Sequence, residues 1–186
     1  MIVESTTALP QDADADTVVI GVLEGEKVHH DVDGVLNALA LHPAQGHRRF
    51  TARGFTITYD PTIVDRIRGM QDSGTVEVRW LTTWEDDANE YLVQQFGWPA
   101  LALAGQRPFP DRLRWWKSEL AQAVYDVGHR VVWTDDDLDY SVRNGDASWA
   151  ETADPARLLM VTPDPRTGLT HAELDRIEAF VGGDPA

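Results

Sequence analysis

The sequence predicts an α/β protein with a doubly wound, Rossmann-like parallel sheet. Short segments rich in β-branched and apolar residues alternate with helical segments along most of the chain, as in a parallel sheet with crossover helices. One of them, ARLLMVTP at 156–163, has the apolar run typical of a strand covered on both faces. The length of 186 residues suits one domain. We assign residues 1–16 to a loosely ordered acidic leader and residues 17–186 to that domain.

Local signals in the first half predict two strands, a hairpin and two helices. TVVIGVL is rich in β-branched residues and ends at the turn residues EGE. Asp60 followed by Pro61 favours a helix start, because aspartate caps the first turn and proline lacks the N–H that would need a partner. The expected strands are 17–23 and 75–84, the hairpin is 48–59 around Gly54, and the helices are 60–70 and 85–97, the second ending at Gly97. Asp86, Asp87 and Asn89 are expected to serve the N-terminus of this second helix.

The second half is expected to continue the alternation. We predict a helix over 108–128, with Asp111 as its N-cap and Gly128 at its end. Thr170 and Glu173 have the spacing of a capping box and begin the last helix, 169–183. The strands of this half are expected at 129–137 and at 156–163, the apolar segment described above.

Charge and composition exclude several classes of protein. The chain has 31 acidic and 16 basic residues, a formal net charge of −15 and a pI near 4.6. It is therefore not expected to bind nucleic acid strongly and non-specifically, although Arg48, Arg49 and Arg53 form a locally basic segment. The absence of cysteine excludes disulfides and thiolate zinc sites. No apolar run is long enough to cross a membrane, so we expect a cytoplasmic protein.

Acidic and hydroxylated residues follow three of the predicted strands. They are Asp31 and Asp33, then Thr82 and Thr83, then the run 135–137, which is three aspartates. Ligands of open parallel sheets bind beyond the carboxyl ends of the strands, so these side chains are expected to meet. Carboxylates that converge repel one another unless a cation compensates them. Oxygen ligands without cysteine favour Mg²⁺, which also leaves coordination positions for a phosphate oxygen.

A phosphoryl group beside Mg²⁺ needs further positive charge and hydroxyl donors. The chain has only two lysines, Lys27 and Lys117. Lys117 lies on the predicted helix that precedes the VVWTDDD strand, within reach of the same edge of the sheet. Most of the seven tryptophans are expected in the core, and Trp84, which follows the threonine pair, is the one expected near the site.

Four segments resemble, in chain order, the four motifs of the haloacid dehalogenase superfamily: DVDGVLN, VRWLTT, the lysine of WWKSEL, and VVWTDDD. The resemblance spans about residues 28–181. The chain looks like a compact actinobacterial-type branch, similar to the phosphatase-like domains of some RNA-repair proteins. Most members of the superfamily are phosphohydrolases with a Rossmann-like core, so the resemblance implies a phosphoric monoester hydrolase.

The resemblance also implies a role for each motif residue. Asp31 would be the nucleophile and form an aspartyl-phosphate, and Asp33 would be the general acid and then the general base. Thr82, or less favourably Thr83, would hydrogen-bond a phosphoryl oxygen. Lys117 would neutralise charge on the nucleophile and the phosphoryl group. The expected magnesium ligands are Asp31, Asp33, Asp135 and Asp136, whereas Asp137 has no assigned role.

One feature departs from the family pattern. His29 and His30 precede Asp31 where the family has apolar residues, so at least one of them is expected to be buried, neutral and hydrogen-bonded. The segments between the motifs have room for a small hairpin and helix insertion but for no large cap domain. We therefore expect an open site, covered at most by the 48–59 hairpin, that accepts a nucleotide, a polynucleotide end or another phosphoester.

Two other readings of the same residues stay open. One is a catalytically silent binding module that keeps the fold, although no catalytic position is visibly lost. A receiver-like phosphoacceptor domain uses a similar inventory of residues. In receivers, however, the acidic pair follows the first strand and the lysine comes near the end, whereas here Lys117 precedes the acidic run at 135–137.

Overall fold

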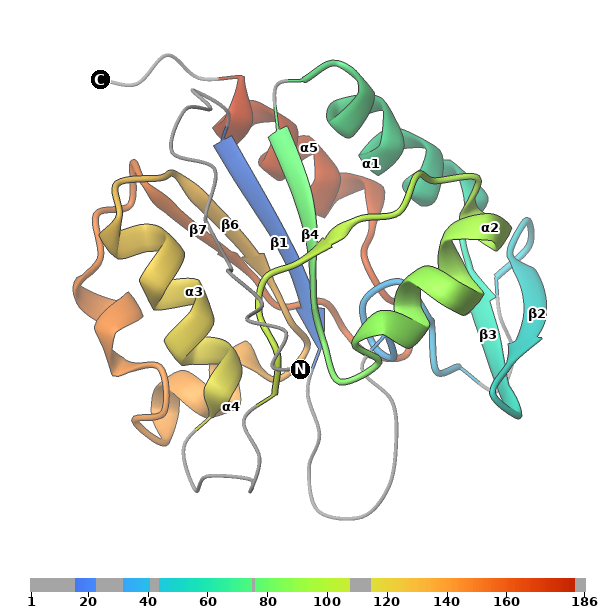
Figure 1. Cartoon of the computed structure of the whole chain (residues 1–186), viewed down its shortest axis with the longest axis horizontal. Coiled ribbons are helices and arrows are strands. Elements are labelled where there is room, and N and C mark those ends of the chain that lie inside the picture. The colour runs from blue at the N-terminus through green and yellow to red at the C-terminus, as the bar shows by residue number, and fades with distance from the viewer. Residues whose placement is uncertain (1–15, 23–31, 41–43, 75, 108–114, 183–186) are drawn as a thin grey trace, which may run out of the picture.

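A five-stranded parallel sheet forms the centre of the protein. The computed structural model describes residues 16–22, 32–40, 44–74, 76–107 and 115–182 (Figure 1). Within them the strand order is β5-β4-β1-β6-β7, all neighbours are parallel, and the sheet is open. The predicted α/β class with a parallel sheet is confirmed at this level. The strands are β1 Asp16–Val22, β4 Val76–Thr82, β5 Ala102–Leu103, β6 Val131–Thr134 and β7 Leu158–Val161.

Helices cover both faces of this sheet (Figure 1). The side chains of β6 alternate, so that Val132 joins the core under α1 and α5, while Val131 and Trp133 join the core under α3 and α4. All three of these side chains are at most 1% exposed. The two cores therefore hold the sheet between two helical layers. The helices are α1 Pro61–Asp72, α2 Val93–Phe96, α3 Trp116–Asp126, α4 Leu138–Arg143 and α5 His171–Val181.

The predicted hairpin is confirmed and stands outside the main sheet, beside α2 (Figure 1). It consists of β2 Arg48–Ala52 and β3 Phe55–Tyr59. Arg53 and Gly54 make the turn with φ of 50° and 86°, the pair of positive values that matches the twist of a two-residue hairpin. Ile57 is fully buried and fixes the hairpin against the core.

Two helix starts agree with the prediction. Asp60 accepts a hydrogen bond from the backbone N–H of Thr62 at 2.8 Å and caps α1. Thr170 and Glu173 form the expected capping box at the start of α5. Both caps depend on residues that are neighbours in sequence, which explains why they could be predicted.

The predicted helix 85–97 starts later and is irregular. Its first turn, Ala88–Leu92, is π-helical, and α2 follows directly and ends at Gly97 with a φ of 68°. Three further short elements were not predicted, because they are too brief to leave a periodic pattern in the sequence. They are β5, α4 and a 3₁₀ turn at Ser148–Thr152.

The first turn of that helix corrects a second prediction. Asp87 and Asn89 were expected to serve the helix N-terminus, but Asp87 makes no capping hydrogen bond and pairs instead with Arg53 of the hairpin. The Asn89 side chain accepts from the indole N–H of Trp80 at 3.0 Å and from the backbone N–H of Leu101 at 2.9 Å. Tertiary contacts therefore take over side chains that local spacing assigned to a cap.

The predicted helix over 108–128 is shorter than expected. α3 begins at Trp116, because Trp115 has an extended backbone (φ −67°, ψ 94°) and stacks on Trp133 with ring centroids 5.0 Å apart. Asp111 therefore does not cap α3, and it lies outside the described residues. Aromatic packing fixes the start of this helix.

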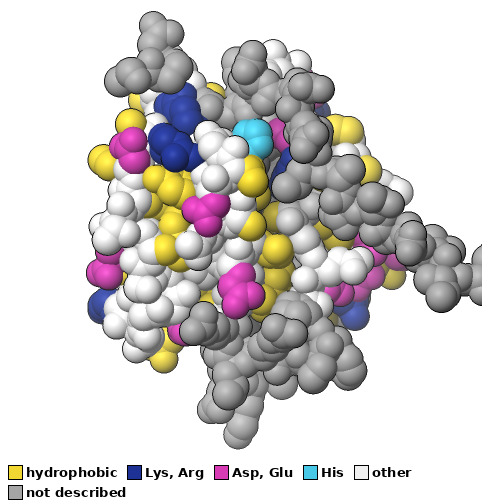
Figure 2. Space-filling view, turned by 60° about the vertical axis from the view of Figure 1, so that its left-hand side comes forward, with side chains coloured by type: hydrophobic (Ala, Val, Ile, Leu, Met, Phe, Trp, Pro, Cys, Tyr) yellow, Lys and Arg dark blue, Asp and Glu magenta, His cyan; other side chains and the backbone are white. Residues whose placement is uncertain are grey.

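The tryptophans are core residues, as predicted, and Trp84 is one of them. Trp80, Trp84 and Trp133 are each at most 2% exposed. The Trp84 ring is thus part of the core, and its backbone N–H bonds Thr82 Oγ1 at the end of β4. On the surface, acidic side chains do not form one patch over the face seen in Figure 2; they are spread among apolar and uncharged side chains.

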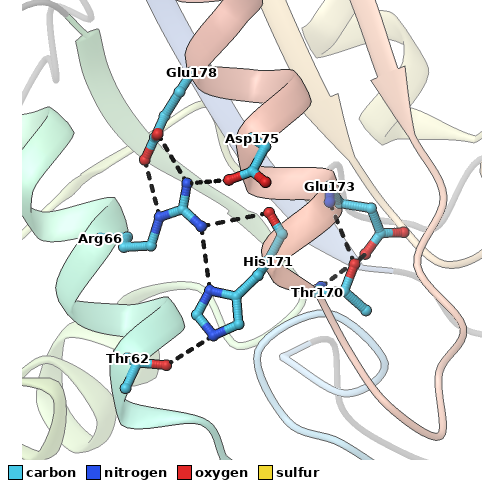
Figure 3. A network of polar contacts seen from close by, with 7 residues as sticks. All are labelled: Thr62, Arg66, Thr170, His171, Glu173, Asp175 and Glu178. Carbon is cyan, nitrogen blue, oxygen red and sulfur yellow. Dashed lines mark hydrogen bonds and ion pairs between the residues drawn. The ribbon is translucent and has the colours of Figure 1, made fainter.

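A polar network joins α1 to α5 (Figure 3). The Arg66 guanidinium pairs with Asp175 at 2.7 Å and Glu178 at 2.8 Å, and these carboxylates raise its pKa further above the ordinary value. Arg66 also lies 3.2 Å from Nδ1 of His171. Because arginine only donates, Nδ1 accepts and Nε2 carries the hydrogen, which it donates to Thr62 Oγ1 at 3.1 Å. These contacts fix two helices of the same layer.

Candidate functional site

The carboxyl ends of the strands lie along one edge of the sheet. Val22 pairs with Thr82 in the neighbouring strand, and Thr134 pairs with Val161. The last residues of β1, β4, β6 and β7 are thus at the same edge, which is the lower one in Figure 1. The sequence placed the site beyond this edge, where ligands of open parallel sheets bind.

The described part of DVDGVLN forms a closed loop at residues 32–37. The Gly34 N–H donates to the Asn37 carbonyl at 2.8 Å, and the Asn37 N–H donates to the Val32 carbonyl at 2.9 Å. Val35 is 1% exposed and anchors the loop in the core. Gly34 has a φ of 85°, a backbone conformation that residues other than glycine rarely adopt. The loop therefore reverses tightly just after Asp33.

This loop meets the acidic run that follows β6. A Cβ atom placed on Gly34 would lie 2.4 Å from Oδ2 and 2.6 Å from Cγ of Asp136. The Asp136 carboxylate therefore rests against the backbone of Gly34, at a distance that only glycine permits. Two motifs far apart in the sequence are therefore in contact through Gly34 and Asp136.

Lys117 and Asp135 form a fully buried ion pair. The Lys117 Nζ lies 3.4 Å from Oδ2 of Asp135, and both side chains are 0% exposed. The backbone N–H of Asp137 donates to the other oxygen, Oδ1, at 3.0 Å. Lysine is rarely fully buried without a partner, because its charge loses hydration. The structure thus brings Lys117 from α3 to the end of β6, where the sequence placed it.

Burial dominates the electrostatics of this acidic run. Desolvation raises the pKa of Asp135 to about 8, and the ammonium of Lys117 opposes the rise. The pKa of Asp137 is also raised by burial, with Lys117 again acting in the opposite direction. A cation placed beside these carboxylates would favour their charged forms.

Thr82 and Thr83 end β4 at the same edge. Thr82 is 3% exposed, and its Oγ1 accepts a hydrogen bond from the backbone N–H of Trp84 at 3.2 Å. Its carbonyl accepts from the N–H of Glu85 at 3.2 Å. Thr82 is therefore fixed in a tight turn, whereas Thr83 is only partly buried.

The β2–β3 hairpin is attached to both neighbouring loops. At one end, the Thr58 N–H donates to Oδ1 of Asn37 at 2.7 Å, and the Ala38 N–H donates to the Thr58 carbonyl at 2.7 Å. At the turn, Arg53 pairs with Asp87, which belongs to the segment after Thr82 and Thr83. The hairpin therefore flanks the site, as expected, and is held in place.

The expected magnesium site is described only in part. Asp31, the predicted nucleophile and ligand, lies outside the described residues, as do His29 and His30. Among the described residues, no group of three or more histidine, aspartate or glutamate side chains is arranged to hold a metal ion. The donors that are described, Asp33, Asp135 and Asp136, are all carboxylates, a chemistry that suits a hard cation.

Asn37 is a site residue that the sequence reasoning missed. It is 3% exposed, and its side-chain amide donates to Oδ1 of Asp33. A sequence signal was present: Asn37 is the polar residue that ends DVDGVLN directly after the apolar Val35 and Leu36. A polar side chain next to buried apolar residues usually has a hydrogen-bond partner, because burying it unpaired costs free energy.

No family model, curated protein or solved structure matches this chain. In the part of the chain that the structure describes, none of the helices is both long enough and apolar enough to cross a membrane.

Proposed function

We propose that the protein is a Mg²⁺-dependent phosphomonoester hydrolase of the haloacid dehalogenase type, with the corresponding doubly wound core. The observation that carries the proposal is the meeting of two motifs at one edge of the sheet. Gly34 lies against Asp136, and the buried Lys117–Asp135 pair adjoins that carboxylate in sequence. A buried lysine next to several carboxylates provides the mixed charges that binding a phosphoryl group and a cation requires.

The reaction proceeds in two displacement steps. A carboxylate oxygen of Asp31 attacks phosphorus, the bond from phosphorus to the ester oxygen breaks, and the acid form of Asp33 gives its proton to that oxygen. Asp33, now a carboxylate, takes a proton from water as the water oxygen attacks the aspartyl-phosphate. The bond between phosphorus and the Asp31 oxygen then breaks, so that inorganic phosphate leaves and both aspartates return to their starting forms.

The remaining residues bind and orient the phosphoryl group. Thr82 would donate a hydrogen bond to a phosphoryl oxygen, and Lys117 would offset its negative charge. Asp31, Asp135 and Asp136 would hold Mg²⁺ through their carboxylates, together with the Val32–Asp33 peptide region, so that the Asp33 carboxyl group stays free for proton transfer. When bound, the cation supplies charge neutralisation for the phosphoryl oxygens and for the clustered carboxylates. The described carboxylates do not make a metal site by themselves, so the proposal requires Asp31.

The proposal is tested with an aryl phosphate. Wild-type protein is expected to hydrolyse 4-nitrophenyl phosphate with Mg²⁺ and to lose that activity in EDTA. Asp31→Asn is expected to lower kcat about a thousandfold or more, because the nucleophile is lost. Asp72→Asn, at the exposed end of α1, is the matched control and should retain activity.

Other outcomes separate the alternatives. Full activity of Asp31→Asn would exclude this residue as the nucleophile and with it the proposed mechanism. Binding of Mg²⁺ without hydrolysis of any phosphoester would favour a catalytically silent binding module. A stable phosphoaspartate formed from a small phosphodonor, without turnover, would favour a receiver-like role.

Two basic side chains of the hairpin favour the proposal that the substrate is large and anionic, such as a phosphorylated polynucleotide end. Arg48 and Arg49 are exposed on β2 and make no ion pair within the described part of the chain. Arg49 is paired in register with Thr58, the residue bonded to the Asp33 loop. Thr58 bonds that loop through its backbone N–H and carbonyl, so the loop lies along the outer edge of β3 and Arg49 is one strand away from it.

We expect the double variant Arg48→Gln, Arg49→Gln to raise the KM for a phosphorylated oligonucleotide about tenfold at low salt, because two phosphate contacts are lost. The KM for 4-nitrophenyl phosphate should stay unchanged, since it has no second phosphate. Steady-state kinetics at two salt concentrations provides the measurement. Arg176→Gln on the exposed surface of α5 is the control. An equal rise in KM for both substrates would contradict a role in recognising the distal phosphates.

A further inference from the structure

The Asn37 side chain makes hydrogen bonds to two different parts of the fold. Its amide nitrogen donates to Oδ1 of Asp33, and its amide oxygen accepts the Thr58 N–H at 2.7 Å. Its backbone closes the loop through Gly34 and Val32. All of this occurs at 3% exposure, where an unsatisfied amide would be costly. The residue is therefore a buried bridge between the Asp33 carboxyl group and strand β3.

This bridge controls the direction of the Asp33 carboxyl group. An N–H donor directed at Oδ1 repels a proton on that same oxygen, so the acid form of Asp33 carries its proton on Oδ2. The carboxyl plane is also fixed, because Asn37 itself cannot rotate without losing its bond to Thr58. A general acid must be within hydrogen-bond reach of the leaving oxygen, and its efficiency depends on that geometry.

We propose that Asn37 is a positioning residue that orients Asp33 for proton transfer to the leaving group and ties this orientation to the hairpin. The inference rests on the proposed hydrolase function. Its consequence is specific to the chemistry of the substrate. An ester with a poor leaving group, such as an alkyl phosphate, needs the proton from Asp33, whereas 4-nitrophenolate leaves without it. Losing the orientation should therefore penalise the alkyl ester alone.

The variant Asn37→Asp tests the donor separately from the hairpin bond. Its carboxylate still accepts the Thr58 N–H but no longer donates to Asp33. We expect kcat/KM for a simple alkyl phosphate to fall about a hundredfold, and kcat/KM for 4-nitrophenyl phosphate to fall less than about threefold. The ratio kcat/KM is the appropriate quantity, because it reports the steps up to breaking of the ester bond. Asn37→Ser, which adds no charge, should show the same selective loss.

Asn89 offers a matched control. It too is an asparagine whose amide oxygen accepts two hydrogen bonds and whose amide nitrogen donates one, to the Leu101 carbonyl at 2.8 Å. Asn89→Asp removes a donor in the same way, but the bonds of Asn89 go to Trp80 and Leu101 and not to Asp33. It should lower the urea midpoint while leaving the ratio of the two kcat/KM values unchanged.

The outcomes distinguish this inference from the proposed function. Equal losses on both esters in the two Asn37 variants would mean that Asn37 only supports the fold, and the inference would be overturned with the hydrolase function intact. No hydrolysis of either ester by the wild type would overturn the function and the inference together. A selective loss of alkyl phosphate turnover in both variants, absent from Asn89→Asp, supports the role of Asn37.

Discussion

Lys117→Met is expected to destabilise the folded state by about 3–5 kcal/mol at pH 10, where Asp135 is ionised in the wild type, and to abolish phosphoester hydrolysis. The Lys117 ammonium is the cation 3.4 Å from Asp135, and both groups are fully buried. Methionine fills a similar volume without charge, so the loss comes from leaving a buried carboxylate uncompensated rather than from a cavity. Urea denaturation measured in EDTA, together with the aryl phosphate assay, provides the test.

The same variant should show a distinct pH dependence. Burial already raises the pKa of Asp135 to about 8, and removing Lys117 removes the main opposing influence, so the pKa rises further. A carboxyl group with a raised pKa binds protons more tightly in the folded state than in the unfolded state. Its contribution to stability is therefore present at acid pH and is lost as pH rises from about 4 towards the folded pKa. Wild-type Asp135 loses stability in the same way up to its own pKa of about 8, so the two proteins diverge above that pH, and the destabilisation should be larger at pH 10 than at pH 7.

A double variant separates stability from catalysis. Adding Asp135→Asn to Lys117→Met removes both charges, so part of the lost stability should return at pH 10 while hydrolysis stays absent. If the single variant is as stable as the wild type at pH 10, the buried pair does not carry the charge balance described above. Recovery of activity in the double variant would contradict the role of Lys117 at the phosphoryl group.

Gly34→Ala is expected to cost about 2–4 kcal/mol of stability and to lower kcat about a hundredfold. Two effects add. Alanine disfavours the φ of 85°, and its Cβ would lie 2.4 Å from Oδ2 of Asp136, so that either the loop or the carboxylate must move. Because Gly34 follows Asp33 directly, a displacement of the loop also displaces the proposed general acid.

Gly54→Ala is a closely matched control. Gly54 has a φ of 86°, but a Cβ there would meet no atom within 4 Å. It should cost only the backbone strain, about 1 kcal/mol, and leave kcat unchanged. The difference between the two alanine variants therefore measures the contact of Gly34 with Asp136. Equal losses in stability, with no loss of activity in Gly34→Ala, would contradict a tight meeting of the two motifs at the site.

Much of the fold could be predicted from local patterns. The α1 cap at Asp60, the capping box of Thr170 and Glu173, and the turn at Gly54 each depend on residues adjacent in sequence. Hydrophobic and β-branched runs likewise identified β4 and β6, because burial on both faces of a sheet requires them. The elements that sequence reasoning missed or misplaced were fixed by distant partners. Trp115 stacks on Trp133 and makes α3 begin later than predicted, and Asp87 pairs with Arg53 and does not cap its helix.

The candidate site divides in the same way. The sequence by itself determined which groups are present: a glycine after Asp33, a lysine ahead of β6 and an aspartate run after it. Only the tertiary structure decided that Gly34 touches Asp136, that Lys117 is buried against Asp135, and that Asn37 links Asp33 to the hairpin. The physical reason is that the sequence gives the identity of each residue directly. Distances between side chains arise only when the sheet and its helices pack and bring together residues that are distant in sequence.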